Sequence, residues 1–573
     1  MEATTPEAHP ELAETLERLR ASAPKWLELG PGAIATLLKE VRKRTLDVAK
    51  PWVEAASEAK GLAQGSPLRG EEWASGPWAV LAALNALIHT LESLEKGRDP
   101  IAGQPVQTRP DGQVVVQVFP ATMWDSLLLS GYSAHVWQQP GVTADRLRDT
   151  IAVRFKGPPP EPKVSLILGA GNINSIPPLD ALYKLVAEGE GCLIKLNPVN
   201  DYLEPFLNAA FAPLVEQGFV KFVKGDGAVG AWLSNHELVD TMHITGSART
   251  HDLIVFGPGP DGEERKRNND PINPRPISSE LGGVGGTIVV PGPWSRADFR
   301  FQAEHLVTQK LHNGGFNCVA SQVIIVPKGW DGTPKLLSAV KDVLREVLEN
   351  RPSYYPGTDK RRSVFTEAHP DADVLGDRNP FVVVEGLSAS DTDVCYVEEA
   401  FGPVWAVAEV DASEPDAFLA AATEFANEKL SGTLSCQVVI HPTTERKHAA
   451  AFDQAIANLR FGAVGINAWS GVAFLLPNAT WGAFPGHTLN DVQSGIGVVH
   501  NAFLFDKPQK TVVRGPFQEF PRTVARGQFH TSPKPLWFVT NQKADQVAEA
   551  LTKFEATRNV ALIPGLFAAA LQG

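Results

Sequence analysis

The sequence predicts an α/β fold with two doubly wound α/β domains, a helical N-terminal part and a small strand-based element. The first observation behind this is that short apolar strands alternate with helical segments from Lys163 onward. Short βαβ units of this kind require parallel strands with helices on both faces of the sheet. The second observation is size, because 573 residues, of which 43% are hydrophobic, exceed what one core holds.

Composition and charge exclude several classes of protein. The chain has 52 Lys and Arg against 65 Asp and Glu, a net charge of −13, which disfavours nucleic acid and anionic membrane surfaces as partners. No signal peptide is expected at the N-terminus, and the longest apolar stretch, residues 78–91, is too short to span a bilayer. Four cysteines without paired spacing predict neither disulfides nor a metal site: Cys192, Cys318, Cys395 and Cys436. We therefore expect a cytoplasmic protein without membrane insertion.

The first 150 residues are mainly helical in pattern. A helix is expected to begin at Pro10, because leucines follow it at helical spacing. Two more are expected over about residues 33–60, with a break or kink at Pro51, and over about residues 73–96. The first clear strand covers residues 114–118.

Two α/β runs follow. The first has strands at residues 164–168, 192–196, 220–223 and 239–244 and helices at residues 176–188 and 203–216. Residues 257–275 are rich in proline, glycine and charge, which predicts a surface loop. The second run has strands at residues 287–290, 322–326, 381–384, 405–410 and 435–440, and helices at about 297–312, 334–349, 414–427 and 444–459. The tail beyond Asn501 has one strand candidate, residues 510–513, and is expected to wrap a neighbouring subunit or another part of the chain.

Three short segments contain candidate catalytic or binding residues. Residues 169–174 follow a strand and open a helix, where nucleotide phosphates bind, although a plain strand-to-helix turn fits equally well. Cys318 follows a glycine-rich turn, so it is either a nucleophile or a buried structural cysteine. Glu280 stands beside two glycines at a strand end, where it is either a catalytic base or a solvated or hydrogen-bonded glutamate.

Together these segments resemble the aldehyde dehydrogenase superfamily, with the features of a divergent bacterial-type member. Six segments agree in order, and they are Gly171-Asn172, Lys195, Ile244-Thr245-Gly246-Ser247, Glu280-Leu281-Gly282-Gly283, the turn at Cys318, and Glu398-Glu399-Ala400-Phe401-Gly402-Pro403. The resemblance covers about residues 163–500.

The resemblance implies a division of the chain. The implied parts are a helical start belonging to the cofactor-binding domain (residues 1–150), an oligomerisation strand (151–163), the dinucleotide-binding domain (164–282), the catalytic domain with the nucleophilic cysteine (283–500), and an oligomerisation strand with the C-terminal tail (501–573). Because such strands pair across subunits in the family, a homodimer or homotetramer is expected.

The resemblance also implies a role for each catalytic residue. Cys318 would attack the aldehyde as a thiolate, and the thiohemiacetal would pass its hydride to NAD or NADP. The Asn172 side chain and the backbone N–H of Cys318 would stabilise the oxyanion. Glu280 would activate the water that hydrolyses the thioester and would help to deprotonate the thiol.

The cofactor-binding residues implied by the resemblance are Gly171, Lys195, Asn197, Gly246, Ser247, Glu399 and Phe401, the last of which would pack near the nicotinamide. Lys195 would lie near the adenosine ribose and Glu399 at the nicotinamide ribose. The backbone at Gly246 and Ser247 would hold the pyrophosphate. Pro198 stands where many NAD-using members have a glutamate, so NADP is admissible as well as NAD.

A tunnel to the thiol is expected to be lined by apolar and aromatic side chains: Ile173, Ile176, Phe316, Val319, Trp469, Phe474 and Trp481. Such a lining favours a hydrophobic aldehyde substrate, aromatic or medium-chain, over a phosphorylated one. The alternative for several of these side chains is a place in the core. Asp180 is the discordant residue of this set, because it either faces the tunnel or caps or pairs elsewhere.

Two alternatives to an acid-forming dehydrogenase are open. A CoA-acylating reductase would pass the same thioester to coenzyme A, but a thiol acceptor needs no water-activating base, so Glu280 favours hydrolysis. A catalytically silent binding protein on the same fold is disfavoured, because packing does not require Cys318, Glu280 and Asn172 together.

Overall fold

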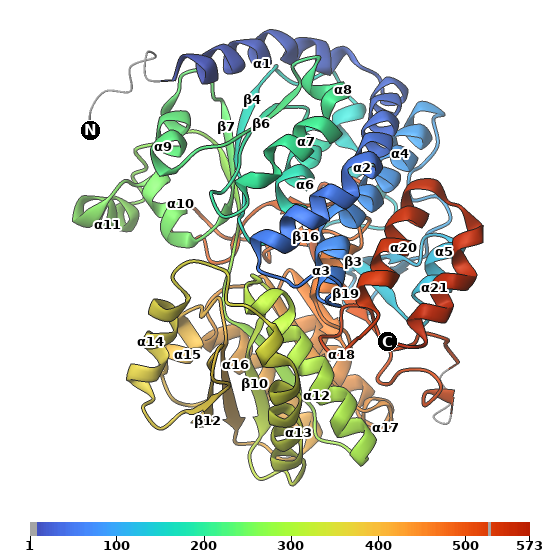
Figure 1. Cartoon of the computed structure of the whole chain (residues 1–573), viewed down its shortest axis with the longest axis vertical. Coiled ribbons are helices and arrows are strands. Elements are labelled where there is room, and N and C mark those ends of the chain that lie inside the picture. The colour runs from blue at the N-terminus through green and yellow to red at the C-terminus, as the bar shows by residue number, and fades with distance from the viewer. Residues whose placement is uncertain (1–8, 525–528) are drawn as a thin grey trace.

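The computed structural model describes residues 9–524 and 529–573, which form two lobes built around separate sheets (Figure 1). The upper lobe contains a six-stranded sheet and the lower lobe an eleven-stranded sheet. Both sheets are largely parallel and connected by helices, which confirms the predicted fold class. In the lower sheet Ile288 and Val289 belong to two different buried clusters, so this sheet is covered by side chains on both faces.

The N-terminal part is helical, as predicted. Helix α1 (Pro10–Glu28) lies across the top of the upper lobe, and α2 (Pro31–Ala59) runs down its side. The predicted break at Pro51 does not occur, and α2 continues through it. Pro51 is exposed while Trp52 and Val53 beside it are fully buried, so the packed face of the helix compensates for the lost backbone hydrogen bond.

A long apolar helical run follows α2. Helix α3 (Arg69–Trp73), a π-turn (Ala74–Trp78) and α4 (Ala79–Glu95) are continuous over Arg69–Glu95. By length and composition this run is able to cross a membrane. The apolar stretch seen in the sequence, residues 78–91, was too short to indicate this. However, 78% of its most apolar window is buried inside the molecule, as in a core helix.

The upper sheet has the strand order β17-β8-β7-β4-β5-β6. Its strands are β4 (Val164–Leu168), β5 (Gly191–Lys195), β6 (Val220–Val223), β7 (Thr241–Gly246), β8 (Ile277–Leu281) and the antiparallel β17 (Gly495–Ile496). Its helices are α6 (Ile176–Tyr183), continued by a π-turn (Lys184–Glu188), then α7 (Glu204–Ala210), α8 (Ala212–Val215), α9 (Gly227–Asn235) and α10 (Ala248–Val255). The carboxyl ends of the parallel strands therefore present the loops after residues 168, 195, 246 and 281 along one edge.

Residues 257–275 do not form the surface loop that was predicted, because α11 (Gly259–Asn268) lies within them. Asp261 is in its first turn and basic residues are in its last turn, which complements the helix dipole. Lys266 also pairs with Asp252 of α10 at 2.7 Å. The helix is polar on almost every side, so it lacks the apolar periodicity by which helices are recognised in a sequence.

The lower sheet has the order β1-β2-β3-β19-β15-β14-β9-β10-β13-β12-β11. Its strands are β1 (Val106–Thr108), β2 (Val114–Phe119), β3 (Ser133–Gln138), β9 (Gly285–Val289), β10 (Ser321–Pro327), β11 (Asp373–Leu375), β12 (Phe381–Ser388), β13 (Val404–Val410), β14 (Ser435–Val439), β15 (Ala463–Ile466) and β19 (Pro508–Arg514). Its helices are α12 (Arg296–Leu311), α13 (Gly332–Val347), α14 (Thr358–Ala368), α15 (Val394–Val397), α16 (Pro415–Lys429), α17 (Pro442–Lys447), α18 (Ala449–Asn458) and α19 (Gly471–Leu475). A separate pair joins β16 (Trp481–Gly482) to β18 (Val498–Val499).

The strand predicted at residues 510–513 is β19, and it pairs within this chain. It lies parallel to β15 on one side and antiparallel to β3 on the other. The expected strand in residues 151–163 is not formed, because this segment contains a 3-10 turn at Val153–Phe155. The prolines that follow the turn lack the N–H donors that a strand ladder needs.

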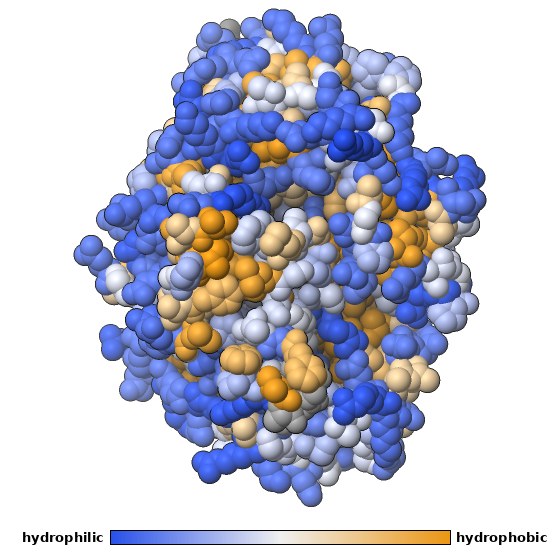
Figure 2. Space-filling model, turned by 90° about the vertical axis from the view of Figure 1, so that its right-hand side faces the viewer, coloured by the Kyte–Doolittle hydropathy of each residue, from blue (hydrophilic) through white to orange (hydrophobic). Residues whose placement is uncertain are grey.

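The C-terminal tail packs on its own chain, one of the two outcomes that the sequence analysis expected. It forms α20 (Ala544–Thr557) and α21 (Ile563–Ala570), and α20 packs against α3 and α21. Together with α4 and α5 (Met123–Leu128) these helices enclose an apolar cavity of about 420 Å³, whose walls include Trp78, Trp124, Leu475, Trp537 and Phe567. Figure 2 shows this side of the molecule, where hydrophobic side chains gather at mid-height.

Candidate active site

The three predicted catalytic residues meet between the two lobes. Glu280 is on β8, Asn172 lies between β4 and α6, and Cys318 precedes β10. The Cys318 Sγ lies 3.6 Å from Oε1 of Glu280. The Asn172 Nδ2 donates to the carbonyl oxygen of Phe316 at 2.9 Å, two residues before the cysteine. A thiol, a carboxylate and an amide are thus brought together from segments far apart in the sequence.

The turn before Cys318 depends on its glycines. Asn313, Gly314 and Gly315 have φ angles of 55°, 68° and 87°, in the left-handed region that disfavours most side chains. A Cβ on Gly315 would lie only 3.1 Å from the carbonyl oxygen of Gly402. The tight turn presents Cys318, which is half-buried, while the other three cysteines are buried.

Burial controls the protonation of the pair. The pKa of Glu280 is raised to about 8, mainly because the carboxylate is desolvated and also because Asp180 is nearby. Burial also raises the pKa of the Cys318 thiol, and the carboxylate of Glu280 raises it further. The free site therefore favours a neutral thiol beside a carboxyl group that titrates near neutral pH, an arrangement typical of a general base and its nucleophile.

Trp481, predicted as a tunnel residue, also contacts Glu280 directly. Its Nε1 donates to Oε1 of Glu280 at 2.7 Å, the same oxygen that faces the thiol. The hydrogen bond favours the ionised form of Glu280 and so partly offsets the effect of burial on its pKa.

A buried cation beneath the catalytic loop was missed by the sequence analysis. Nζ of Lys60, just after α2, lies 2.7 Å from Glu72 and donates to the Asn172 carbonyl at 3.1 Å and to Asn313 Oδ1 at 2.9 Å. Lys60 and Glu72 are 5% and 2% exposed in their side chains. Tyr354 donates to the same carbonyl of Asn172 at 3.2 Å. This network holds the Asn172 main chain and the Asn313 side chain. The sequence feature that marks it is Glu72, a charged residue inside an otherwise apolar helical run.

The predicted adenosine-side residues lie at the end of β5 and in the loop after β4. Burial lowers the pKa of Lys195, and Asp226 at the start of α9 partly counters this. A Cβ on Gly171 would meet the Asn197 side chain at 2.8 Å, so the two loops are in close contact. Pro198 beside them is exposed.

The predicted phosphate and ribose residues also face this edge. Ser247 caps α10 by accepting a hydrogen bond from the Thr250 backbone at 3.2 Å, and Gly246 just before it is exposed. Burial raises the pKa of Glu399 to about 7, and its Oε1 is a buried atom without a partner among the described residues. A Cβ on Gly282 would lie 2.2 Å from the Glu399 carboxylate. An unpartnered acceptor, a glycine cradle and a helix N-terminus fit a dinucleotide.

The predicted tunnel residues separate into groups. Ile173, Ile176 and Phe474 pack in one small apolar cluster with Ala170. Phe474 contacts Trp481, with ring centroids 5.5 Å apart. Val319 and Trp469 belong to the large core cluster against which Cys318 packs, and Trp469 contacts the ring of His312.

Phe316 and Phe401 lie in a separate aromatic group. Phe316 is fully buried and packs against Tyr354, Tyr355 and Phe401. Phe401 has a φ of 38°, and its carbonyl accepts a hydrogen bond from Arg361 at 3.1 Å. Phe316 is thus part of the core around the cysteine turn rather than an exposed wall.

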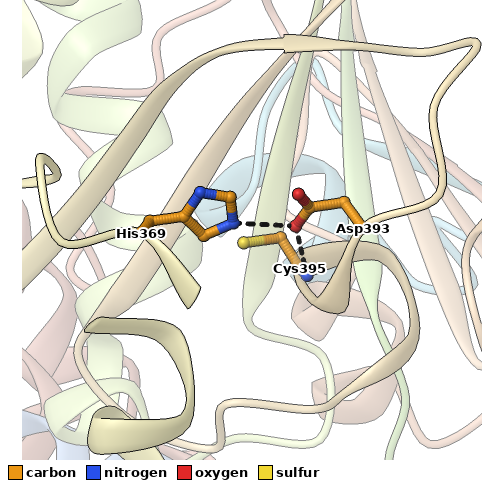
Figure 3. A group of neighbouring side chains, drawn as sticks. All are labelled: His369, Asp393 and Cys395. Carbon is orange, nitrogen blue, oxygen red and sulfur yellow. Dashed lines mark hydrogen bonds and ion pairs between the residues drawn. The ribbon is translucent and has the colours of Figure 1, made fainter. Parts of the chain in front are cut away.

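A second cluster of ligand-type side chains lies in the lower lobe (Figure 3). The ring of His369 points at the carboxylate of Asp393, with Nε2 to Oδ1 at 3.1 Å, and the Cys395 thiol lies beside them. The ligand atoms are within 4.8 Å of one another, a proximity that the sequence spacing did not suggest. Asp393 also caps α15 by accepting from the Cys395 backbone at 2.8 Å, so helix capping accounts for its orientation.

Comparisons with known proteins give a family match over part of the chain. Residues 196–351 match the model of the aldehyde dehydrogenase family, a span that includes Glu280 and Cys318. No curated protein matches the sequence.

Solved structures resemble the whole fold at low sequence identity. A salicylaldehyde dehydrogenase from Pseudomonas putida G7, complexed with salicylaldehyde, superimposes with a TM-score of 0.58 at 16% identity, covering 89% of this chain and 92% of that one. An NAD-dependent aldehyde dehydrogenase from Sinorhizobium meliloti gives 0.56 at 16% identity, covering 87% and 85%. An NADP-dependent glyceraldehyde-3-phosphate dehydrogenase from Bacillus halodurans C-125, complexed with NADP, gives 0.56 at 15% identity, covering 88% and 91%.

Proposed function

Residues 196–351 match the aldehyde dehydrogenase family, and from that premise we propose that the chain is a member that oxidises an aldehyde to the carboxylic acid with NAD or NADP. The observation that carries the proposal is the contact between the Cys318 thiol and the Glu280 carboxylate, 3.6 Å apart, with the Asn172 amide beside them. Glu280 supports hydrolysis to the acid because it is a buried base next to the acyl-bearing sulfur.

In the first half of the reaction, Glu280 removes the thiol proton and Cys318 adds to the aldehyde carbon. The resulting oxyanion is held by the Asn172 side-chain amide and the Cys318 backbone N–H; one such donor is typically worth about 3–4 kcal/mol. A bound nicotinamide would supply the hydride acceptor for the thiohemiacetal carbon, and Cys318 would then carry the acyl group as a thioester.

Between the two halves, Glu280 releases the proton that it took from the thiol to solvent and is ionised again. In the second half, Glu280 takes a proton from water as the water attacks the thioester. The tetrahedral adduct collapses, the bond to sulfur breaks, and the Cys318 thiolate and the carboxylic acid separate. Since ionised Glu280 is required here, its raised pKa makes this half of the reaction faster as the pH rises toward about 8.

Lys195, Glu399 and the backbone at Gly246 and Ser247 would hold the cofactor. The absence of a carboxylate at position 198 leaves room for a 2′-phosphate, so NADP is admitted as well as NAD. The apolar group of Ile173, Ile176 and Phe474 near the thiol supports a hydrophobic aldehyde, aromatic or medium-chain.

Assembly and location remain predictions. A homodimer or homotetramer is expected from the family, but β19 is already paired on both sides within the chain, so an interface would use other surfaces. A cytoplasmic location is expected as well. CoA acylation is the second candidate activity, and a silent binding protein the third.

The decisive experiment follows reduced cofactor with a panel of aliphatic and aromatic aldehydes, NAD and NADP, with and without coenzyme A. We expect aldehyde-dependent reduction that does not need coenzyme A and yields the free acid. Cys318→Ala should abolish turnover and retain cofactor binding, whereas Cys436→Ala, a buried cysteine outside the site, should stay active. A requirement for coenzyme A, or turnover by Cys318→Ala, would contradict the proposal.

A further inference from the structure

A buried chain of hydrogen-bonded side chains lies beside Glu280 on the same face of the upper sheet. It is referred to as the buried chain and consists of Asp180, Thr245, His243 and Ser278. We propose that the buried chain takes up the proton that Glu280 gains from water and delivers it to the surface. This inference rests on the proposed function, because it assigns a route to the proton released in thioester hydrolysis.

The pairing of β7 with β8 places three members of the chain next to the base. Thr245 is directly opposite Glu280, and His243 is directly opposite Ser278, in a parallel register. Because side chains alternate along a strand, all four point to one face of the sheet. Helix α6, which packs against β4 and β5, contributes Asp180 to that face.

The distances make the chain continuous. Thr245 Oγ1 donates to Asp180 Oδ2 at 2.9 Å. His243 Nε2 lies 3.1 Å from that hydroxyl and 3.5 Å from the same Asp180 oxygen. His243 Nδ1 lies 2.9 Å from Ser278 Oγ. Asp180, His243 and Thr245 are 0%, 2% and 7% exposed, whereas Ser278 is only half-buried, so the chain leads outward.

The buried chain has unused hydrogen-bond acceptors at its inner end, next to Glu280. Oδ1 of Asp180 and Oε2 of Glu280 are both buried and have no hydrogen-bond partner among the described residues. The charge of Asp180 contributes to the raised pKa of Glu280, so the two carboxylates are close enough to interact. Two neighbouring carboxylates hold one proton between them more readily than none, so Asp180 is placed to share the proton of Glu280.

Every link can carry a proton in either direction. A hydroxyl both donates and accepts, and a neutral imidazole has one N–H and one acceptor nitrogen. Thr245 donates inward to Asp180 in this structure, so an outward shift requires its hydroxyl to turn toward His243 Nε2, 3.1 Å away. A proton that enters at Asp180 is then matched by one that leaves at Ser278, after each link passes one proton outward. No atom is gained or lost in this shift, and Glu280 returns to its ionised form.

The other titratable groups around the inner end do not replace Asp180. Cys318 is the nucleophile, and burial lowers the pKa of His500 to about 4, so its ring is neutral near neutral pH. Trp481 contacts the opposite oxygen of Glu280, Oε1. His243 and Asp180 remain as the ionisable groups of the chain itself.

Three variants test the chain: Asp180→Asn, His243→Gln and Thr245→Val, with Ser165→Ala as control. Ser165 is a buried hydroxyl on β4 of the same sheet, without a partner among the described residues. Two rates are measured for each protein: the pre-steady-state burst of reduced cofactor, and the hydrolysis of acyl-Cys318 formed from 4-nitrophenyl acetate without cofactor.

We expect bursts within about twofold of wild type and acyl-enzyme hydrolysis at least tenfold slower in all three variants. In Asp180→Asn the acid limb of the hydrolysis pH profile should also move to lower pH, because the negative charge beside Glu280 is gone. A merely structural role would not move this limb. In His243→Gln the acid limb should stay at the wild-type pH while the hydrolysis rate falls. Ser165→Ala should match wild type in both the limb and the rate.

Unchanged hydrolysis rates, or an unmoved limb in Asp180→Asn, would overturn the proposal. Failure of the proposed function is distinguishable from this. A wild-type protein that oxidises no aldehyde contradicts the proposed function, while the ester measurement still tests the chain.

Discussion

The indole nitrogen of Trp481 and Oε1 of Glu280 are 2.7 Å apart, although 201 residues separate them in the sequence. The indole N–H is a donor only, so it stabilises the carboxylate more than the carboxylic acid. The same oxygen lies 3.6 Å from the Cys318 thiol. The contact thus orients the Glu280 carboxylate toward the thiol, which is the orientation that the proposed base requires.

Replacing Trp481 with Phe should move the pH dependence of turnover. Loss of the donor raises the pKa of Glu280 further above its present value of about 8, so the acid limb of acyl-enzyme hydrolysis moves to higher pH. The measurement is the hydrolysis rate from pH 6 to 10. Trp469→Phe is the control, since Nε1 of Trp469 is buried without a partner among the described residues. Equal limbs in both variants would contradict this role for Trp481.

The raised pKa of Glu280 also predicts how stability changes with pH. The folded state binds the proton more tightly than the unfolded state, whose pKa is the ordinary 4.5, so stability is fully present below pH 4.5 and falls as the pH rises toward 8. Glu280→Gln removes this titration. The melting temperature of Glu280→Gln relative to wild type should therefore increase from pH 5 to pH 8 and then level off, as measured by thermal unfolding. A constant difference would mean that Glu280 titrates normally.

The fold was largely predictable because its central strands are buried on both faces. Such strands form continuous apolar runs, and the predicted strands match β4 to β7, β9, β10 and β12 to β14 closely. Helix α11 was missed because charge patterning, not apolar periodicity, stabilises it. The strand expected in residues 151–163 from the family resemblance does not form, because the prolines of this segment lack the N–H donors that a strand needs.

The site was only partly predictable. Cys318, Glu280 and Asn172 could be predicted as candidates because each stands in a short segment with characteristic glycines. The proposed chemistry also requires a thiol, a carboxylate and an amide at these positions. The contact of Lys60 with Asn172 joins residues 112 positions apart, and no local pattern encodes it. Asp180 was noticed as discordant, but its partner Thr245 depends on how α6 packs over β7.

Removing the buried cation beneath the catalytic loop should destabilise the protein strongly. Lys60→Met leaves the Glu72 carboxylate buried without its ion pair, which typically costs about 3–5 kcal/mol. Lys39→Met is the matched control, because its pair with Glu92 is exposed and such pairs contribute about 0–1 kcal/mol. Denaturant unfolding measures both. The double variant Lys60→Met, Glu72→Gln should recover part of the loss, and an equal cost for both single variants would contradict the role of Lys60.

A carboxylate at position 198 should shift the cofactor preference toward NAD. Pro198 is exposed beside the end of β5, where Lys195 is expected near the adenosine ribose. Pro198→Glu should lower kcat/KM for NADP at least tenfold relative to NAD by charge repulsion with the 2′-phosphate. Pro198→Gln has the same shape without the charge and should keep the wild-type ratio. Equal ratios in the two variants would place the adenosine ribose elsewhere.

The apolar group near the thiol predicts the choice of aldehyde. If Ile173, Ile176 and Phe474 line the path to Cys318, each added CH2 of the substrate is transferred from water to an apolar wall, at about 0.8 kcal/mol or roughly fourfold in kcat/KM. Efficiency should therefore rise from acetaldehyde toward octanal, and benzaldehyde should exceed acetaldehyde.

The second apolar cavity, under α20 and α21, provides the control for this prediction. Leu475 lines that cavity and directly follows Phe474, so the two apolar regions approach each other at α19. Phe474→Ala should flatten the dependence of kcat/KM on chain length, whereas Trp124→Ala, in the wall of the cavity, should leave it unchanged. The opposite result would mean that the hydrocarbon chain binds in the cavity. Efficiency that falls from acetaldehyde to octanal in the wild type would exclude both locations, because neither apolar region would then contribute binding energy to the reacting aldehyde.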